Sequence, residues 1–570
     1  MADNKRYPQA EIGNKTFTQA AVVIIGAGIS GMCTAINLLN NNIHNFVILE
    51  KSGGFGGTWR DNKYPGCCCD IYAHLYSYSF EQNPDWTRLY AGQEEILKYL
   101  HGVAEKYKLA RYIRFNSSVE ETRWDDAARK WNTAVTVAGA KDSEFGEQYT
   151  ITSDFLVSAV GQLNFPQNPS IPGLDDFKGK MMHSARWDWS YDLKGKRIAV
   201  IGNGATAAQI VPEIAPEASH LTIYQRTPNW VAPRLDIPVW KPVRAMFKYL
   251  PPVRWRFRAT IMDFREVTYS AVTNQESTMA NFIRNESLKM MKRQLPNQPE
   301  LWEKVTPDYP VGCKRILLSD NYFPTLARKN VTLETGHIER ITEKGIVVDS
   351  VETEYDLIVL ATGFRTVEFM HPIKVYGTNG RSLSDIWSKT QGARALYGVT
   401  VESLPNFGML YGPNTNLGHN SIILMIEAQA RYIYAMISAV LRARQQGQSL
   451  AITPKPSRVE GFNAEMQEVL KSTSFAHPNC SSWYKTEEGL ITNNWSGTVV
   501  DYQKLLSKLD WNDFDLAGYG STNLGAKTTH LGRVREESMV GYKTLGVAVS
   551  VLAVAGGIAM KAPHLLPRWK

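Results

Sequence analysis

The sequence predicts an α/β protein built on two separate parallel sheets, and two observations support this prediction. A short apolar run is followed at once by a glycine-rich loop and then by a helical pattern, and this arrangement occurs twice, around Gly26 and around Gly202. Apolar runs of this kind are typical of central parallel strands that are buried on both faces. The 570 residues, 44% of them hydrophobic, are enough for several domains with large cores.

The first glycine loop follows the predicted strand 21–25. Gly26 permits the tight turn, Gly28 lets a pyrophosphate approach the backbone, and Gly31 allows close packing of the following helix. The next predicted strand ends in Glu50, about 20 residues on, where an acidic side chain accepts the ribose hydroxyls. An acidic residue there favours a dinucleotide without a 2′-phosphate, hence FAD.

The second glycine loop follows the predicted strand 197–201 and contains Gly202, Gly204 and Ala207, alanine being a common third small residue. Its next strand, 221–224, leads into Arg226 rather than an acid. A guanidinium can hold the 2′-phosphate of NADP with two hydrogen bonds, whereas the alternative is a solvated surface arginine. The sequence therefore predicts two Rossmann-like dinucleotide-binding domains, each three-layered around a parallel central sheet.

Charge and targeting signals add little to this prediction. The formal net charge of +8 is mild for the length and is explained by phosphate-bearing cofactors, and no nucleic-acid-binding motif accompanies it, so we predict no nucleic-acid partner. The first 19 residues have no apolar segment typical of a signal peptide. An intracellular, reducing setting is expected.

The six cysteines are too few and too unevenly spaced to predict a disulfide framework. Because none of their pairs has CxxC spacing, we predict neither a metal site nor a dithiol redox centre. The run 67–69 is interpreted as buried small residues near a cofactor. The cysteines are Cys33, Cys67, Cys68, Cys69, Cys313 and Cys480.

Two further strings resemble a known family. The stretch 56–70 matches the pattern [A/G]GxWxxxx[F/Y]P[G/M]xxxD at every fixed position, and 177–188 reads FxGxxxHxxxW followed by Asp. Together they resemble the signatures of type I Baeyer–Villiger monooxygenases, similar to cyclohexanone, phenylacetone and 4-hydroxyacetophenone monooxygenases. A plain linker with a packed aromatic and a core histidine is the alternative for the second string, whose fixed residues are Phe177, Gly179, His183, Trp187 and Asp188.

The resemblance implies an activity. NADPH would reduce FAD, and one oxygen atom of O2 would be inserted beside a ketone carbonyl through a flavin peroxide, giving an ester or lactone. Arg315 would be the catalytic cation and Asp70 would orient it; Lys314 would contact the NADP phosphate. Trp483 and Trp495 would face the substrate. The alternatives are a flavin-dependent N- or S-oxygenase and, from another class, a membrane-tethered flavoprotein that acts as a binding module.

The resemblance also implies cofactor contacts. Those for FAD are Gly26, Gly28, Gly31, Glu50, Thr58, Trp59, Asp61, Asp70, Ile71, Tyr76, Val119 and Ile422. Those for NADP are Cys68, Gly202, Asn203, Gly204, Ala205, Thr206, Ala207, Ala208, Arg226, Thr227, Lys314 and Arg315.

The expected domain division follows these motifs. We expect a discontinuous FAD domain (1–165 and 350–505), an NADP domain (166–349) with a helical insertion at about 230–307, and a C-terminal extension (506–570). The insertion could cap the substrate entrance, cover a sheet face, or lie on a membrane or on nucleic acid. The resemblance covers roughly residues 20–500 and leaves the extension out.

The extension contains an uncharged apolar run, 544–560, between Lys543 and Lys561. Its 17 residues are at the lower limit for a membrane span, so a C-terminal anchor and a docked or interfacial helix are both open. The sequence predicts neither the particular ketone nor the oligomeric state.

Overall fold

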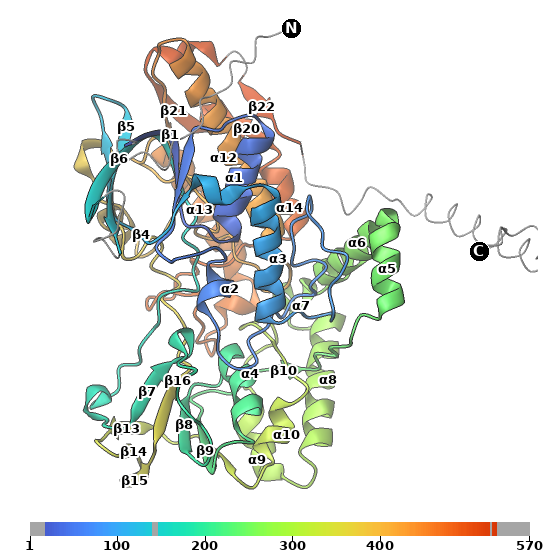
Figure 1. The fold of residues 1–570 in the computed structure, drawn as a ribbon. Coiled ribbons are helices and arrows are strands. Elements are labelled where there is room, and N and C mark those ends of the chain that lie inside the picture. The colour runs from blue at the N-terminus through green and yellow to red at the C-terminus, as the bar shows by residue number, and fades with distance from the viewer. Residues whose placement is uncertain (1–17, 139–145, 525–526, 533–570) are drawn as a thin grey trace, which may run out of the picture.

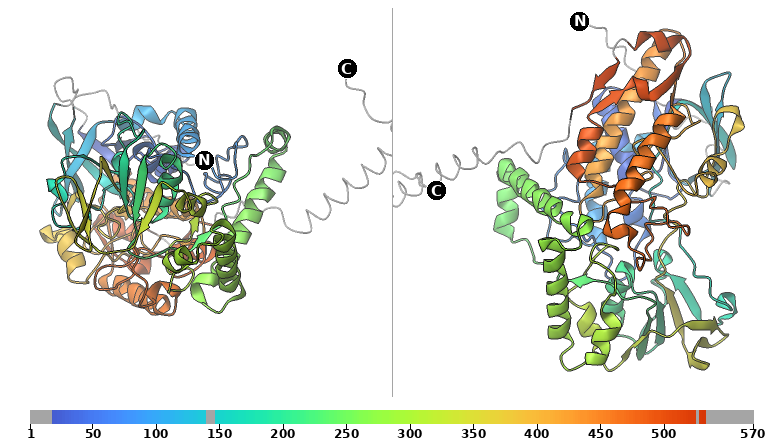
Figure 2. Two further views of the ribbon diagram at one scale, coloured as in Figure 1. Left: turned by 90° about the horizontal axis from the view of Figure 1, so that it is seen from below. Right: turned by 180° about the vertical axis from the view of Figure 1, so that it is seen from behind.

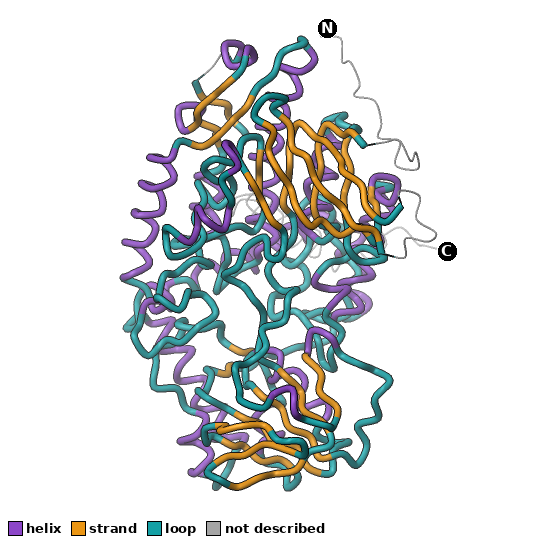
Figure 3. Tube along the Cα trace, turned by 90° about the vertical axis from the view of Figure 1, so that its left-hand side faces the viewer, coloured by secondary structure: helices purple, strands orange, loops and turns teal. Residues whose placement is uncertain are grey.

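A computed structural model describes residues 18–138, 146–524 and 527–532. The chain forms two lobes, each built around its own sheet (Figure 1). Between the two sheets the backbone consists largely of loops (Figure 3). The predicted α/β class with two dinucleotide-binding domains is confirmed.

The larger lobe is centred on β1 (Gln19–Ile25), which pairs in parallel with β2 (Phe46–Leu49) and β6 (Gln148–Ser158). The strand order is β17-β4-β5-β6-β1-β2-β3, and β18 pairs with β6. The other strands of this sheet are β3 (Ile113–Arg114), β4 (Ser117–Asp125), β5 (Lys130–Val137), β17 (Lys374–Tyr376) and β18 (Phe407–Met409).

Two helices form the core beside this sheet. The first, α1 (Ile29–Asn40), packs against α12 (Ile422–Gln445), whose side chains are buried along almost its whole length. Among the described residues α12 is long and apolar enough to cross a membrane, but 78% of its apolar window is buried inside the protein, so it is a core helix here. The lobe also contains α2 (Thr58–Asp61), α3 (Gln93–Lys106), α11 (Leu383–Ser388), α13 (Pro456–Lys471) and α14 (Val499–Leu505).

The smaller lobe has a five-stranded, fully parallel sheet in the order β12-β9-β8-β16-β7. The helices α4 (Ala205–Ile214) and α10 (Tyr322–Leu326) lie against it, and an antiparallel three-stranded sheet adjoins it. Its strands are β7 (Lys180–His183), β8 (Arg197–Ile201), β9 (His220–Tyr224), β12 (Val331–Glu334) and β16 (Leu357–Leu360), and the adjoining ones are β13 (Ile338–Ile341), β14 (Gly345–Val348) and β15 (Val351–Glu354).

The expected helical insertion is present as α5 (Lys241–Tyr249), α6 (Pro251–Val267), α7 (Ser270–Thr273), α8 (Thr278–Gln294) and α9 (Pro299–Val305), between the short strands β10 (Val231–Ala232) and β11 (Leu317–Leu318). It bridges the lobes, because Arg258 of α6 donates to the His74 carbonyl of the larger lobe at 2.7 Å. The α5–α6 hairpin projects from one side of the molecule (Figure 2).

Two expected domain boundaries move. The strand β16 pairs with β8 and β7, so the chain leaves the smaller sheet after Leu360 rather than at residue 349. The first part of the expected C-terminal extension packs on the larger lobe: β21 (Phe514–Ala517) pairs with β19 (Ala451–Pro454), and β20 (Lys508–Asp510) with β22 (Thr528–His530). Sheet pairing and core packing define these boundaries, and the positions of the motifs in the sequence do not contain that information. The division into FAD and NADP domains itself stays a proposal.

The two chain crossings between the lobes lie side by side. The Gln167 amide donates to the Gly363 carbonyl at 2.9 Å, and the Arg365 amide donates to the Phe165 carbonyl at 3.0 Å. This short pairing makes a two-stranded connection between the lobes.

Candidate active site

A large cavity of about 1,460 Å³ lies between the lobes, at the ends of β1 and β8 where the two glycine loops begin. Open parallel sheets bind their ligands at this edge. Pockets for one drug-sized molecule are about 300–1,000 Å³, so this cavity has room for more than one ligand.

The first glycine loop has the geometry that its sequence predicts. Gly26 has φ of +105°, and a Cβ at Gly31 would lie 1.9 Å from the Gly26 carbonyl oxygen. No residue other than glycine fits at these two positions without moving the backbone. The loop leads into α1, whose first turn offers free N–H groups and a positive dipole end to a phosphate.

Glu50 is fixed at the end of β2. Its carboxylate accepts hydrogen bonds from the amides of Ala27 at 2.7 Å and Ser52 at 2.8 Å, and from the Ser52 hydroxyl at 2.8 Å. A carboxylate has about four acceptor sites, so roughly one is left for a ribose hydroxyl. Glu50 lines the cavity together with Val119 of β4, which places both predicted contacts around one nucleotide position.

Two buried polar atoms in the cavity wall fit a bound FAD. The side-chain oxygens of Asn62 and Gln162 are buried and have no hydrogen-bond partner within the described protein. Buried acceptors are normally satisfied, so a donor from a bound ligand is expected here. Nearby, the Trp59 indole N–H donates to the Tyr76 hydroxyl at 3.2 Å, which holds two predicted contacts against each other.

The second glycine loop fits NADP. Gly202 has φ of +110°, and a Cβ there would lie 2.5 Å from the Ala361 carbonyl oxygen. At Gly204, by contrast, a Cβ would meet no described protein atom within 4 Å. The space over Gly204 opens to the cavity, at the N-terminus of α4, where a pyrophosphate can approach the backbone.

Three predicted phosphate contacts converge beside this loop. The Lys314 ammonium donates to the Thr227 hydroxyl at 2.9 Å and lies 4.7 Å from the centre of the Tyr309 ring. Burial lowers the pKa of Lys314 to about 8, and the nearby Arg226 guanidinium adds to the shift. Two cations held close together, with Asn203 fixed by a 2.8 Å hydrogen bond to the Thr227 carbonyl, form a site suited to a dianion.

Asp70 and Arg315 meet as the sequence predicts. The guanidinium donates from Nε to Oδ2 and from Nη2 to Oδ1, the latter at 2.6 Å, and Nη1 donates to the Leu417 carbonyl at 3.1 Å. Burial alone would raise the pKa of Asp70, but the charge and hydrogen bonds of Arg315 hold it below its usual value. Each side chain keeps about a quarter of its surface accessible (23% for Arg315, 27% for Asp70), and both line the cavity.

Most predicted contacts line this cavity, and a few lie behind it. Gly31, Ala207 and Ala208 do not line it; the two alanines are buried in the smaller lobe's core, where they let α4 approach the sheet closely. The cavity-lining residues among those predicted are Gly26, Gly28, Glu50, Thr58, Trp59, Asp61, Asp70, Ile71, Tyr76, Val119, Ile422, Cys68, Gly202, Asn203, Gly204, Ala205, Thr206, Arg226, Thr227, Lys314 and Arg315.

The stretch 177–188 lies outside the cavity. Its strand β7 is the edge of the smaller sheet, and the buried His183 ring lies 6.1 Å from Phe364 in the second crossing. Burial and the Arg186 charge lower the pKa of His183 to about 4, so the ring is neutral. Arg186 in turn donates to the Asn164 carbonyl in the first crossing at 3.1 Å. The stretch thus contacts both crossings between the lobes.

One expectation about an aromatic residue needs correction, and one disulfide was not predicted. Trp483 lines the cavity, but Trp495 is buried against Tyr502, with its indole N–H donated to the Thr498 carbonyl, because it packs in the core beside α14. Cys313 and Cys480, 167 residues apart in sequence, form a disulfide. A spacing of this length carries no pairing signal, so the sequence did not reveal it.

The interpretation of the run 67–69 as buried residues holds for Cys69, whereas Cys67 and Cys68 are half-buried. Cys69 is buried in the core, and Cys67 and Cys68 line the cavity. Burial raises the pKa of Cys67 to about 12 and that of Cys68 to about 11, so these thiols stay protonated.

Sequence reasoning missed two residues that organise the site. Gln209 of α4 spans the lobes: its amide oxygen accepts from the Tyr64 hydroxyl at 3.0 Å, and its amide nitrogen donates to the Cys68 carbonyl at 3.1 Å. Arg265 of α6 donates to the His419 carbonyl at 2.7 Å and is close enough to Asp70 to lower its pKa. Neither belongs to a sequence motif, and tertiary packing brings them in.

A cavity with two dinucleotide-binding glycine loops and a fixed arginine–carboxylate pair defines a two-cofactor flavoprotein oxidoreductase. Residues 19–374 match the family model described as flavin-binding monooxygenase-like. The chain is 55% identical over 553 residues to the FAD-binding monooxygenase ktnD of Aspergillus niger, covering 97% of this chain and 90% of that protein. It is 40% identical over 509 residues to a Baeyer–Villiger monooxygenase of Streptomyces coelicolor, covering 89% and 94%.

Among solved structures, a crystal structure of OTEMO in complex with FAD and NADP matches with a TM-score of 0.74 and 26% identity, covering 87% of this chain and 99% of that one. The chain therefore belongs to the flavin-binding monooxygenase family, with Baeyer–Villiger monooxygenases among its relatives. It is an NADPH-dependent flavoprotein monooxygenase that uses FAD.

The comparison with the Aspergillus niger protein also corrects the expected extent of the resemblance. At most 17 residues of this chain lie outside that match, so it must include most of residues 506–570. The extension is thus shared with at least one relative.

The lowered pKa of Lys314 predicts a pH dependence of NADPH binding. The ammonium is charged below about pH 8 and neutral above it. We expect KM for NADPH to rise by up to ~10-fold from pH 7 to pH 9, while KM for NADH, which has no 2′-phosphate, stays flat. Steady-state kinetics across this range measure it, with Lys314→Arg, which should remove the rise, as the matched control, because arginine stays charged. A rise that persists in full in Lys314→Arg contradicts the assignment.

Proposed function

We propose that this chain inserts one oxygen atom of O2 beside the carbonyl of a ketone to give an ester or a lactone. The observation that carries the proposal is the Arg315–Asp70 pair in the cavity wall, next to Lys314. The carbonyl oxygen gains negative charge when its carbon is attacked, and a fixed guanidinium stabilises that charge without transferring a proton. FAD, once reduced by NADPH, supplies the activation of O2.

The surrounding residues hold Arg315 in one orientation. Asp70 binds it through two parallel hydrogen bonds, a geometry that only a guanidinium can form, and the Leu417 carbonyl accepts a third bond. Three fixed bonds leave the guanidinium little freedom to rotate, so no reorganisation is needed when charge develops.

A panel of ketones tests the proposal. Linear, cyclic, aryl and polyketide-derived ketones are incubated with the FAD-loaded enzyme and NADPH, and products are analysed by mass. We expect at least one ketone to yield a product heavier by one oxygen atom, with NADPH consumed in proportion. Amines and sulfides form the comparison panel. Oxygenated amines or sulfoxides, without any ester or lactone, would favour the rival N- or S-oxygenase. No NADPH consumption with any compound would favour a binding module.

Membrane contact is a second proposal, and exposed apolar residues support it. Of the seventeen large hydrophobic side chains that are exposed in the described part of the chain, eleven lie between Leu235 and Phe282. The helices α5, α6 and α8 carry eleven basic and three acidic residues, and ten of the basic residues remain when the buried Arg258 is left out. Apolar and basic residues together suit an anionic lipid surface, whereas two copies of this basic face would repel each other.

The apolar segment 544–560 lies outside the described residues and is proposed as a C-terminal anchor. We expect full-length protein in the membrane fraction, and a chain truncated after Arg535 mostly in the soluble fraction, because most apolar anchoring surface is removed. Replacing Trp240, Tyr249 and Leu250 with serine in the truncated chain should abolish the remaining binding to anionic vesicles. Val351→Ser/Val469→Ser, at exposed apolar positions elsewhere, is the matched control. Full-length protein that stays soluble without detergent contradicts the anchor.

A further inference from the structure

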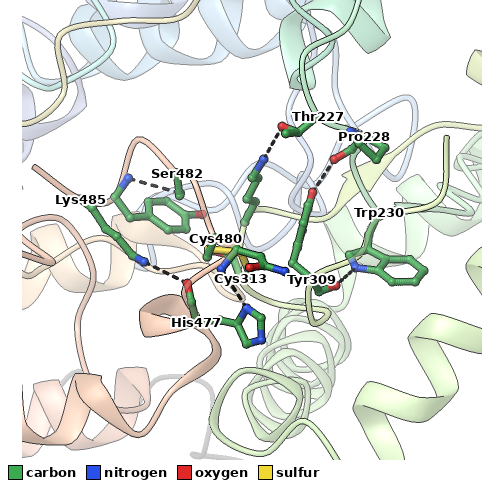
Figure 4. The surroundings of a disulfide bond; sticks show 12 residues. Thr227, Pro228, Trp230, Tyr309, Cys313, His477, Cys480, Ser482 and Lys485 are labelled. Carbon is green, nitrogen blue, oxygen red and sulfur yellow. Dashed lines mark hydrogen bonds between the residues drawn. A yellow bond between two sulfur atoms is a disulfide. The ribbon is translucent and has the colours of Figure 1, made fainter. Parts of the chain in front are cut away.

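The Cys313–Cys480 disulfide joins the two walls of the active-site cavity. Cys313 lies in the loop between α9 and β11, and Cys480 lies in the segment 477–492 that follows a short helical turn, Ser474–Ala476. Their Cα atoms are 5.8 Å apart, and the two residues are 0% and 3% exposed. Figure 4 shows the disulfide between Tyr309 and His477, where the insertion meets the larger lobe.

On each side of the disulfide the following residues line the cavity. Cys313 directly precedes Lys314 and Arg315, and Cys480 directly precedes the lining residues 481–483. The disulfide therefore ties the loop that carries the phosphate-binding lysine and the catalytic arginine to a segment of the opposite wall.

The segment also reaches the catalytic arginine itself. Tyr484, four residues after Cys480, is buried; burial raises its pKa to about 12, and the nearby charge of Arg315 opposes that rise. The Trp483 carbonyl accepts hydrogen bonds from Thr366 at 3.0 Å and Asn493 at 2.9 Å. These bonds tie the segment to the larger lobe only.

Noncovalent attachment of the segment to the loop 306–316 consists of the packing of Cys480 with Tyr309 and Val311, the approach of Tyr484 to Arg315, and one long hydrogen bond. The Asn479 amide donates to the Asp308 carboxylate at 3.5 Å, and both side chains are exposed, so water competes for this bond. The segment itself is irregular, with an isolated bridge between Lys485 and Ile491 rather than a helix or sheet. A segment without regular structure depends on such point attachments for its position.

We propose that the Cys313–Cys480 disulfide is a positioning element that holds the segment 481–487 against Lys314 and Arg315, and so keeps the cavity closed around NADP. This inference rests on the proposed function for the role of Arg315, and on the NADP site for the rest. Opening the disulfide with a dithiol consumes two electrons and two protons, gives two thiols, and converts the dithiol to a disulfide. The two thiols return to the disulfide when hydrogen peroxide takes up those electrons and protons and becomes two waters.

The two states differ in what holds the cavity wall. With the disulfide intact, the segment and the Lys314 loop move as one body. With two thiols, the segment stays tied to the larger lobe through Thr366 and Asn493, and the Lys314 loop can move relative to it at the NADP site. We expect NADP(H) to bind several-fold more weakly and NADPH to be consumed with less product formed, whereas FAD, held by the glycine loop at Gly26, stays bound.

The test uses the full-length, FAD-loaded enzyme in three forms: untreated, reduced with dithiothreitol, and Cys313→Ser/Cys480→Ser. Non-reducing peptide mass analysis verifies the 313–480 link, and counting free thiols verifies its reduction. The readouts are the Kd for NADP+, KM for NADPH, the product formed per NADPH, and FAD content. Cys33→Ser is the matched control, because Cys33 is a free, buried cysteine in α1.

We expect a several-fold higher Kd and KM in the reduced enzyme and in the double variant, with kcat and FAD content changed much less. Reductant should add no effect in the double variant, and Cys33→Ser should respond to reductant as the wild type does. Equal Kd and KM in the oxidised and reduced enzyme would overturn the proposal, as would free thiols at both positions in the native protein. The Kd for NADP+ needs no ketone, so it decides this inference even if no ketone is oxygenated.

Discussion

Arg315→Ala should abolish oxygenation while FAD stays bound and is still reduced by NADPH. Removing one fixed donor to a developing oxyanion typically costs 10²–10³ in kcat, and here the donor is also a full positive charge, so we expect a loss of at least about 10³-fold. FAD should stay bound because its glycine loop depends on Gly26 and Gly31, and Arg315 is not part of that loop. Product analysis with an accepted ketone, together with anaerobic reduction of the flavin by NADPH, measures both halves of the prediction.

Two further variants separate chemistry from folding. Arg315→Lys keeps the charge but cannot form both bonds to Asp70, so it should retain a small fraction of the activity. Arg340→Ala, whose side chain is 59% exposed in the smaller lobe, should leave activity unchanged. Wild-type product yields from Arg315→Ala would refute the assignment. Loss of bound FAD in that variant would show instead that the unpaired Asp70 disrupts the site.

The second large effect concerns the choice between NADPH and NADH. Each charge-assisted hydrogen bond to the 2′-phosphate contributes on the order of 1.5–3 kcal/mol, which is roughly 10- to 150-fold in affinity. We therefore expect Lys314→Ala and Arg226→Ala each to raise KM for NADPH by about that factor, because the phosphate loses a cation. KM for NADH should change little in both variants, since NADH has no 2′-phosphate.

The ratio of kcat/KM for NADPH to that for NADH is the decisive measurement. It should be well above 10 in the wild type and fall stepwise in the single and double variants. Lys289→Ala, at a lysine that is 72% exposed on α8, is the surface control and should not change the ratio. Equal efficiency of the wild type with both cofactors would contradict the phosphate site.

Much of the site was predictable because its chemistry is local in sequence. A strand, a glycine loop and a helix follow one another within about 20 residues, so this order can be read from a short string. It predicts cofactor contacts at Gly26, Glu50, Gly202 and Gly204, and all four residues line the cavity. The pairing of Asp70 with Arg315 was predictable as well, although the two are 245 residues apart, because Asp70 lies in a string that resembles a family signature and the same resemblance implies that Asp70 orients Arg315. The role of each residue in catalysis stays a prediction.

The remaining features depend on contacts between segments that are distant in sequence. Gln209 bridges the lobes and Arg265 approaches Asp70 only because α4 and α6 pack where they do. For the same reason Trp495 is buried away from the cavity.

What the sequence by itself determined is the pair of cofactor cradles and the class of chemistry, since backbone conformation at a glycine and the charge of a side chain are properties of short strings. Only the tertiary structure decided that the two glycine loops line one cavity and that a disulfide joins the walls of that cavity. Cys313 and Cys480 illustrate the difference: 167 residues separate them in sequence, and their Cα atoms are 5.8 Å apart in space. Pairing over such a distance follows from the packing of both lobes together, and no local pattern encodes it.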